Sequence, residues 1–389
     1  MLWFLLLGLG VSLGSTRVRA FAPAAVHPTA ESSALQMSPF LLGDDAAVAF
    51  AFPQRTPEAG LHLRRGDTSP VPRVDPPRAT TLVLTMGDWS VQYGSRYQRG
   101  PNEEVSSPEH DFGVSARFDR VRLGVSASFL AEGRRLRWGE PLETRFFSRA
   151  RQDVYLVGWG YDADRWQVDA SSGVSIDHLE VDDPNRTSGI NGYRSGESLR
   201  PILTLRLSVE QGVDRWTMYA GYRDMTLEET VSRGQSGDLE KRELYGHVLF
   251  AGIGGARKIG NLTQLRWSVD YDDTRYPDVR PWQSSEMLTL LRDLGGAIGV
   301  ERRLASVRWG APTLLASVRF ESGESLIWDK QWSVDPARIR TTQTRRPETR
   351  ASWGLSAEKW GVRVTTTFLE TYLGEYKWSL ASLDLSATF

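Results

Sequence analysis

The chain has 389 residues, a formal net charge of −1 and a mean hydropathy of −0.37. The near-zero charge gives no reason to expect nucleic acid or an anionic membrane surface as a partner. Cysteine is absent, which excludes disulfide bonds, thiol catalysis and cysteine-based zinc sites. The average hydropathy is that of a soluble protein, but a membrane barrel needs apolar residues only at alternate positions and looks equally polar. Periodicity must therefore distinguish the two classes.

The N-terminus has the features of an export signal. Residues 1–13 form an apolar stretch, and Val18-Arg-Ala20 places small residues suitably for cleavage after Ala20. The basic residues that usually precede such a stretch are missing. The stretch is also too short for a membrane anchor, which takes about 20 residues. We therefore expect a signal peptide over residues 1–20.

The next segment, residues 21–79, holds nine of the 19 prolines. Proline cannot donate to a sheet ladder, so this composition predicts a linker, a periplasmic extension or a plug. Such an extension could contact a periplasmic partner. We place the barrel itself at residues 80–389, with residues 46–52 and 80–85 as a candidate additional pair of strands.

From residue 88 onward, apolar and polar residues alternate. In residues 121–126, for example, valine and leucine alternate with arginine, glycine and serine. A two-residue period predicts strands with one apolar and one polar face. The fold class we predict is all-β, a closed antiparallel transmembrane β-barrel of 14 strands, or of 16 with the additional pair. The strands are expected at 88–98, 109–119, 121–133, 150–161, 165–179, 198–210, 213–226, 241–255, 261–272, 296–308, 312–322, 349–358, 361–370 and 376–389.

The connections between these strands alternate between short and long. The short ones are 119–120, 162–165, 211–213, 257–260, 310–311 and 359–360, and the long ones are 134–149, 180–197, 227–240, 273–295 and 323–348. Outer-membrane barrels have short periplasmic turns, long external loops and an even number of strands. The alternation therefore predicts that all the short turns lie on the periplasmic side.

The last nine residues, 381–389, alternate between the two faces and end in Phe389. This pattern resembles the terminal strand of Gram-negative outer-membrane β-barrel proteins. The resemblance covers about residues 88–389 and implies an outer-membrane location, contact with outer-membrane lipids and recognition of Phe389 by the barrel-assembly machinery. It does not identify a subfamily: an N-terminal extension and 14 strands are similar to fatty-acid transporters, but their N-terminal hatch motifs are not found.

Alternation also selects the residues that face the lumen, because a charged residue on the lipid face costs about 2–4 kcal/mol near mid-bilayer. The inward charges have both signs, which argues against strong ion selectivity. A polar conduit and a cross-braced interior without an open path are both compatible with them. The pore-lining candidates are Arg122, Asp169, Asp177, Arg206, Arg215, Arg223, Arg266, Asp270 and Arg363.

Four tryptophans lie beside short turns, where an aromatic girdle marks the inner membrane interface. Ordinary core packing is the alternative for each of them. The four are Trp166, Trp216, Trp309 and Trp360.

Three places depart from regular alternation. Arg302 and Arg303 put charge on both faces, which predicts a bulge or a position at the rim. Leu380 is out of phase with Leu383, which predicts a bulge in the last strand. Residues 284–295 carry leucines at helical spacing between serine and glycine, which predicts a short helix within an external loop. Such a helix could constrict the lumen or merely cover the loop.

The sequence gives no support for an enzyme, a metal or a cofactor. The chain has five histidines, none in a metal-binding pair, and no Gly-x-Ser-x-Gly, His-Glu-x-x-His or phosphate-loop motif. Asp177 and His178 are neighbours on a strand and point to opposite faces, so they cannot form a simple dyad.

We therefore consider two functions, and neither the solute nor the oligomeric state follows from the sequence. The first is a channel for passive or weakly selective passage of small polar solutes. The second is a non-conducting barrel that serves as an anchor, an export-complex component or a surface receptor, with residues 21–79 contacting a periplasmic partner.

Overall fold

The computed structural model describes residues 30–42, 48–55, 59–66, 78–99, 106–138, 144–183, 192–233, 238–278, 285–305, 311–331, 344–370 and 378–388. The proposed signal peptide, Trp309 and Phe389 lie outside these ranges. No helix in the described ranges is long and apolar enough to cross a membrane.

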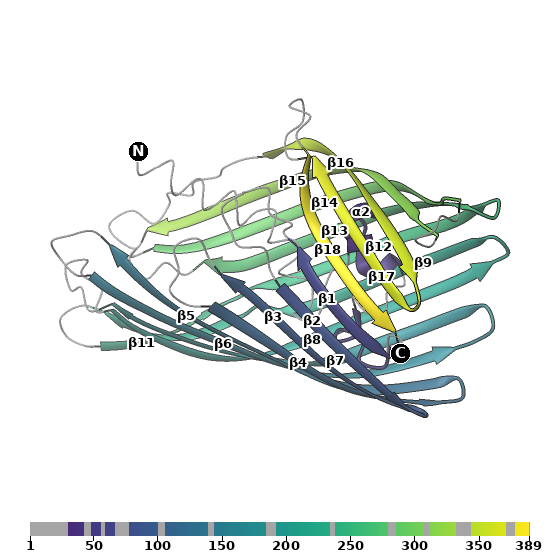
Figure 1. Ribbon diagram of the computed structural model, residues 1–389. Coiled ribbons are helices and arrows are strands. Elements are labelled where there is room, and N and C mark those ends of the chain that lie inside the picture. Colours follow the sequence, from purple (N-terminus) through teal and green to yellow (C-terminus); the bar gives the residue numbers. More distant parts are fainter. Residues whose placement is uncertain are drawn as a thin grey trace.

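All strands belong to one closed antiparallel sheet (Figure 1). The strands are β1 (Gly60–Gly66), β2 (Arg78–Met86), β3 (Trp89–Arg99), β4 (Ser106–Phe118), β5 (Val121–Trp138), β6 (Thr144–Asp162), β7 (Trp166–Asp183), β8 (Gly192–Gln211), β9 (Asp214–Asp224), β10 (Leu227–Arg233), β11 (Asp238–Leu244), β12 (His247–Ile259), β13 (Thr263–Asp278), β14 (Ser285–Arg303), β15 (Thr313–Gln331), β16 (Thr344–Lys359), β17 (Val362–Glu370) and β18 (Trp378–Thr388).

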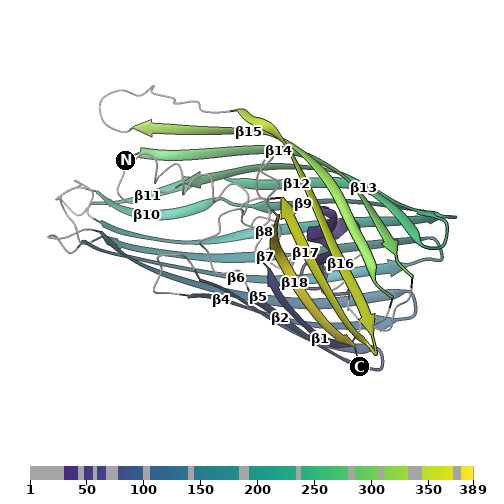
Figure 2. The ribbon, with the colours of Figure 1, turned by 45° about the horizontal axis from the view of Figure 1, so that its top comes forward.

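The barrel has sixteen strand positions, the larger of the two predicted counts. β9 continues into β10, and β11 continues into β12, after interruptions of two residues at 225–226 and 245–246. β1 closes the ring: it pairs with β2 on one side, and its seven residues all have partners in β18 on the other. β1, β2, β17 and β18 are short, between 7 and 11 residues, whereas β8 has 20 (Figure 2).

Two expectations about the start of the barrel are wrong. The wall begins at Gly60 and not at residue 80, and the partner of β2 is β1 and not residues 46–52. The described part of the latter segment folds as a turn, in which the Phe52 amide donates to the Val48 carbonyl at 2.7 Å. Its small and aromatic side chains are fully buried inside the barrel, so their alternation reflects packing in the lumen rather than a sheet.

Deleting residues 60–66 is expected to prevent the barrel from closing. β2 and β18 would then both become open edges, and each unsatisfied backbone group in hydrocarbon costs several kcal/mol. The measurement is the mobility of the unheated protein on a denaturing gel, where a folded barrel migrates apart from its heated form. Removing seven residues at 68–74, between β1 and β2, serves as the control. A folded mobility for the 60–66 deletion would contradict this account of closure.

The faces of the strands follow the predicted alternation. In β9 the residues at 217, 219, 221 and 223 are buried, while those between them are exposed. The short turns are tight: Trp360 and Gly361 both have positive φ (54° and 75°), as a two-residue hairpin turn requires. In β18, Ala387 pairs with Val362, directly after this turn. The C-terminal end of the chain therefore lies at the short-turn end of the barrel.

The described part of the predicted helix over 284–295 is not helical, because residues 285–295 belong to β14. They pair with β13 on one side and β15 on the other, for example Leu291 with Thr274 and with Ser325. Two long neighbouring strands supply backbone partners on both sides for residues 287–295, and this outweighs the helical spacing of the leucines. Without this helix, a helical constriction of the lumen by these residues is excluded.

The other two irregularities are resolved by the pairing. Arg302 and Arg303 are the last residues of β14 and keep a regular register with β15, so they occupy the rim and not a bulge. The predicted bulge in the last strand is confirmed. Thr367 pairs with Ser382 and Phe368 with Leu380, which leaves Ala381 as the extra residue.

Candidate functional site

Part of the N-terminal segment lies inside the barrel. It comprises α2 (Ala30–Leu35), α3 (Pro39–Leu42) and the turn at residues 48–55. Figures 1 and 2 both show α2 within the ring of strands. We call residues 30–42 and 48–55 the plug. A plug was one of the three alternatives for residues 21–79, and residues 60–66 of the same segment instead form β1 in the wall.

The first part of the plug is held by polar groups of β15 and β16. The Ala34 carbonyl accepts hydrogen bonds from the hydroxyls of Ser317 and Ser352, at 2.8 and 2.6 Å. The Gln36 side chain donates to the Arg350 carbonyl at 3.1 Å, and the main-chain carbonyl of Gln36 accepts from the Arg319 guanidinium at 3.1 Å. These bonds satisfy main-chain groups that the short helix α2 leaves without helical partners.

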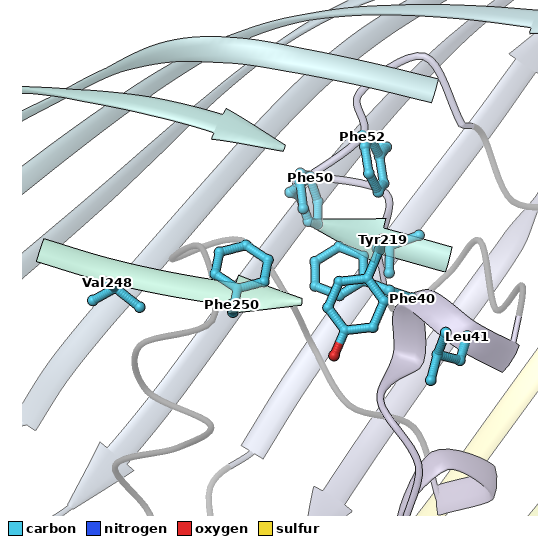
Figure 3. Packing of buried hydrophobic residues seen from close by; sticks show 9 residues of the cluster. Phe40, Leu41, Phe50, Phe52, Tyr219, Val248 and Phe250 are labelled. Carbon is cyan, nitrogen blue, oxygen red and sulfur yellow. The ribbon is translucent and has the colours of Figure 1, made fainter. Parts of the chain in front are cut away.

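The middle of the plug packs on an apolar patch of the wall (Figure 3). Phe40 lies against Tyr219 and Phe250, with ring centroids 5.0 and 5.9 Å apart, and meets Phe52 edge-on at 5.6 Å. Phe50 and Phe52 have no exposed surface. Tyr219 and Phe250 face inward from β9 and β12, so this contact fastens the plug to a second part of the wall, separate from the strands that hold its first part.

The last part of the plug is held by β3–β7. The Ala49 carbonyl accepts from Gln92 at 3.1 Å, and the Phe50 carbonyl accepts from Ser126 at 2.8 Å. The Gln54 amide donates to the Trp159 carbonyl at 3.0 Å. The plug is therefore bound to strands on all sides of the lumen.

A buried network of charged side chains holds the C-terminal end of the plug at Arg55. Asp169 on β7 lies between Arg55 of the plug, at 2.6 Å, and Arg206 of β8, at 3.0 Å. Arg55 also reaches Asp162 at 3.4 Å, and Asp162 pairs with Arg122. Removing one partner of a buried ion pair typically costs about 3–5 kcal/mol, so this network ties plug and wall together strongly.

Glycines on the inner face of the wall make room for the plug. A Cβ at Gly124 would overlap the backbone of Pro53 and Gln54, and a Cβ at Gly94 would lie 2.8 Å from the Phe50 ring. The positions that would meet plug atoms in this way are Gly94, Gly124, Gly158, Gly160, Gly254, Gly299 and Gly354. These seven glycines lie on six strands spread around the barrel. The inner surface of the wall is therefore complementary in shape to the plug.

Several of the plug contacts lie in the half of the barrel nearer the short turns. Ser126 and Ser317 are five and four residues from the short-turn ends of their strands, which start at Val121 and Thr313. Asp169 is three residues from the start of β7 at Trp166. A transmembrane strand takes about 9–11 residues, so these three contacts lie between the short turns and the middle of the membrane.

The structure places the nine pore-lining candidates on the inner face, most of them in pairs. Asp169 and Arg206 belong to the plug network, and Asp177 lies 3.1 Å from Arg200. The remaining pairs are Arg122 with Asp162, Arg266 with Glu301 at 2.9 Å, Asp270 with Arg319 at 2.9 Å, Arg363 with Glu358 at 2.7 Å and Arg223 with Ser175 at 3.3 Å, while Arg215 faces inward near the turn end of β9.

Sequence reasoning missed several residues of this site. Gln54 and Arg55 were assigned only to a proline-rich segment, and Arg200 and Arg319 were not singled out although their strand phase places them inward. The inward glycines carried no separate signal, because a glycine in an alternating strand can also mark a bulge. The unusual run of alanine, valine and phenylalanine at 46–52 was the one visible sign of buried packing.

Three of the four predicted girdle tryptophans lie within the described residues. Trp166, Trp216 and Trp360 are exposed by 43, 43 and 89 % and sit beside short turns. Trp89 and Trp159 add exposed tryptophans on the outer surface of the barrel. In the described part of the chain, no group of three or more acidic, histidine or cysteine side chains could hold a metal ion.

No protein-family model and no curated protein matches the sequence. Solved structures do match. CdiB from Escherichia coli matches with a TM-score of 0.51 and 11 % identity over 86 % of this chain, and CdiB from Acinetobacter baumannii with 0.52 and 7 % over 86 %. This protein therefore has the fold of an outer-membrane β-barrel.

The barrel spans about three fifths of those two structures, 64 and 60 % of their lengths. A monoaromatic hydrocarbon channel, CymD, aligns over 95 % of this chain and 99 % of its own, with a TM-score of 0.44 and 14 % identity. At these identities the similarity concerns the fold alone. The function must be argued from the lumen of this barrel.

Proposed function

We propose that the protein is an outer-membrane channel for small polar solutes whose lumen is closed by its own plug at rest. The observation that carries this proposal is the plug, which crosses the lumen and is bound on all sides. Sixteen-stranded barrels are wide enough to leave an aqueous channel unless something fills them. Here residues 30–42 and 48–55 supply the filling.

The wall behind the plug is suited to water. Its inward positions are rich in hydroxyl and charged side chains, including Ser171, Thr204, Ser208, Thr217 and Thr365, all of which are buried. The apolar exception is the patch of Tyr219, Val248 and Phe250 against which the plug packs. Displacing the plug would therefore expose a mainly hydrophilic lumen.

The mixed signs of the inner charges favour weak selectivity. Arg122, Arg206 and Arg266 each have an acidic partner, so no single sign dominates near the plug. A lumen with paired charges presents a polar surface without a strong net field.

The test compares single-channel conductance in planar bilayers for the full chain and for a form lacking residues 30–55. This deletion removes the plug and leaves β1, so the wall keeps its sixteen positions. We expect a low conductance for the full chain and a stable, large conductance for the deletion. The gel mobility of both proteins controls for folding.

The opposite result would favour the non-conducting alternative. If the deletion forms a folded barrel that carries no current, the lumen is blocked by the wall itself. The N-terminal segment would then be better explained as a structural or partner-binding element than as a gate.

A further inference from the structure

The barrel wall is interrupted between β8 and the strand formed by β9 and β10. Pairing reaches Ile202 with Arg223 and resumes in the same register at Ser195 with Thr230. Residues 196–201 and 224–229 lie between these pairs and form no ladder with each other. Pro201, within this stretch, has no amide hydrogen to donate.

The inner side of the interruption is closed by one side chain. Arg200 donates to the Thr226 carbonyl at 2.8 Å and lies 3.1 Å from Asp177. The Thr226 amide donates to the Asp224 carboxylate at 2.7 Å. Side chains thus satisfy the main-chain groups that the missing ladder leaves open, so the interruption is a formed feature of the wall.

A pocket of about 380 Å³ lies at the interruption, within the usual size range of small-molecule sites. It is reached from the outer face, because Leu199, Tyr222 and Tyr245 among its lining are exposed by 68, 39 and 61 %. The side chains that line the pocket and could contact a ligand include Leu199, Tyr222, Asp224, Tyr245, His247 and Arg275.

Three polar residues form one row across the pocket. His247 pairs with Asp224 on one side and with Arg275 on the other, so the three side chains project from the same face of adjacent strands. Neighbouring strands are about 4.8 Å apart. The row therefore offers hydrogen-bonding groups to a ligand over about 10 Å: Asp224 accepts, His247 donates or accepts, and Arg275 donates.

The pocket lies at the outer membrane interface. Counted from the short-turn end, Asp224 is the last of the 11 residues of β9, and His247 is the last of the 13 residues of β12. A transmembrane strand takes about 9–11 residues, so these residues reach the level of the outer headgroups.

We propose that this pocket binds the sugar headgroup of a glycolipid in the outer leaflet. Sugar hydroxyls both donate and accept, which matches the row of Asp224, His247 and Arg275. The rings of Tyr222 and Tyr245 offer apolar faces for a sugar, and Leu199 offers a surface for an acyl chain. A phosphate is disfavoured, because the carboxylate of Asp224 offsets the charge of Arg275 in the same row.

Native mass spectrometry of the full-length protein in detergent tests this. The probes are monogalactosyl diacylglycerol, which has a neutral sugar headgroup, and phosphatidylglycerol with matched chains. We expect the galactolipid to be retained in preference to phosphatidylglycerol. Arg275→Ala and Tyr245→Ala are each expected to reduce galactolipid retention several-fold.

Matched controls separate the pocket from general lipid contact. Arg292→Ala removes an outward arginine on β14, and Tyr155→Ala removes an outward tyrosine on β6, and neither residue lines the pocket. Both controls are expected to retain the galactolipid as the unmodified protein does. Equal or stronger retention of phosphatidylglycerol would overturn the proposal, and so would an equal loss in the control variants. Because the pocket lies outside the lumen, these results are independent of whether the barrel conducts.

Discussion

Replacing Gly124 by leucine is expected to open the channel in an otherwise intact chain. Gly124 faces the plug, and even a Cβ there would overlap the backbone of Pro53 and Gln54. Backbone atoms cannot move aside as a flexible side chain can. The leucine must therefore push this end of the plug away from β5.

The size of the effect follows from the cost of overpacking. Extra methylene groups in a packed interior typically cost about 1–3 kcal/mol. A cost of that size shifts the ratio of docked to displaced plug by a factor of roughly 5 to 150. The overlap with backbone atoms argues for the upper end of this range.

The measurement is the open probability in planar bilayers, compared with that of the form lacking residues 30–55. Gly323→Leu is the matched control, because the atoms nearest to a Cβ at Gly323 belong to Asp293 and Arg292 of the wall strand β14 and not to the plug. We expect frequent openings for Gly124→Leu and few for Gly323→Leu. A folded Gly124→Leu barrel with unchanged conductance would show that the plug can be displaced at Gly124 without opening a path.

A disulfide between plug and wall is expected to abolish these openings. An ideal Cβ at Gly354 would lie 3.0 Å from the Cβ of Ala34, close to the 3.5–4.5 Å that a disulfide spans. The chain has no cysteine, so Ala34→Cys with Gly354→Cys introduces the only pair that can form. The bond would fasten α2 to β16 and prevent the first part of the plug from leaving.

The test adds both cysteine substitutions to the Gly124→Leu variant. Openings are expected to disappear under oxidising conditions and to return when a reductant is added to the same membrane. The single substitution Gly354→Cys controls for the added side chain itself. If openings persist in the fully oxidised double variant, the conducting path does not require α2 to move.

Period-two alternation located the strands from β3 onward but missed β1. All fourteen predicted strands are present, and the inward charges on β5, β7, β8 and β13 were assigned to their face correctly by phase alone. This works because neighbouring side chains on a strand point to opposite faces, and one face meets lipid. Strand ends were less predictable: β5 continues to Trp138 and not only to residue 133, because pairing with β6 extends it.

The sequence by itself determined the class of the protein: an alternating wall with short turns at one end and an even number of strands. Only the tertiary structure decided what fills the lumen. Burial of Phe50 and Phe52, the contact of Arg55 with Asp169 and the glycines that receive the plug all join residues far apart in the chain. No local pattern specifies such contacts, because each depends on which strands the closed barrel brings to the same height.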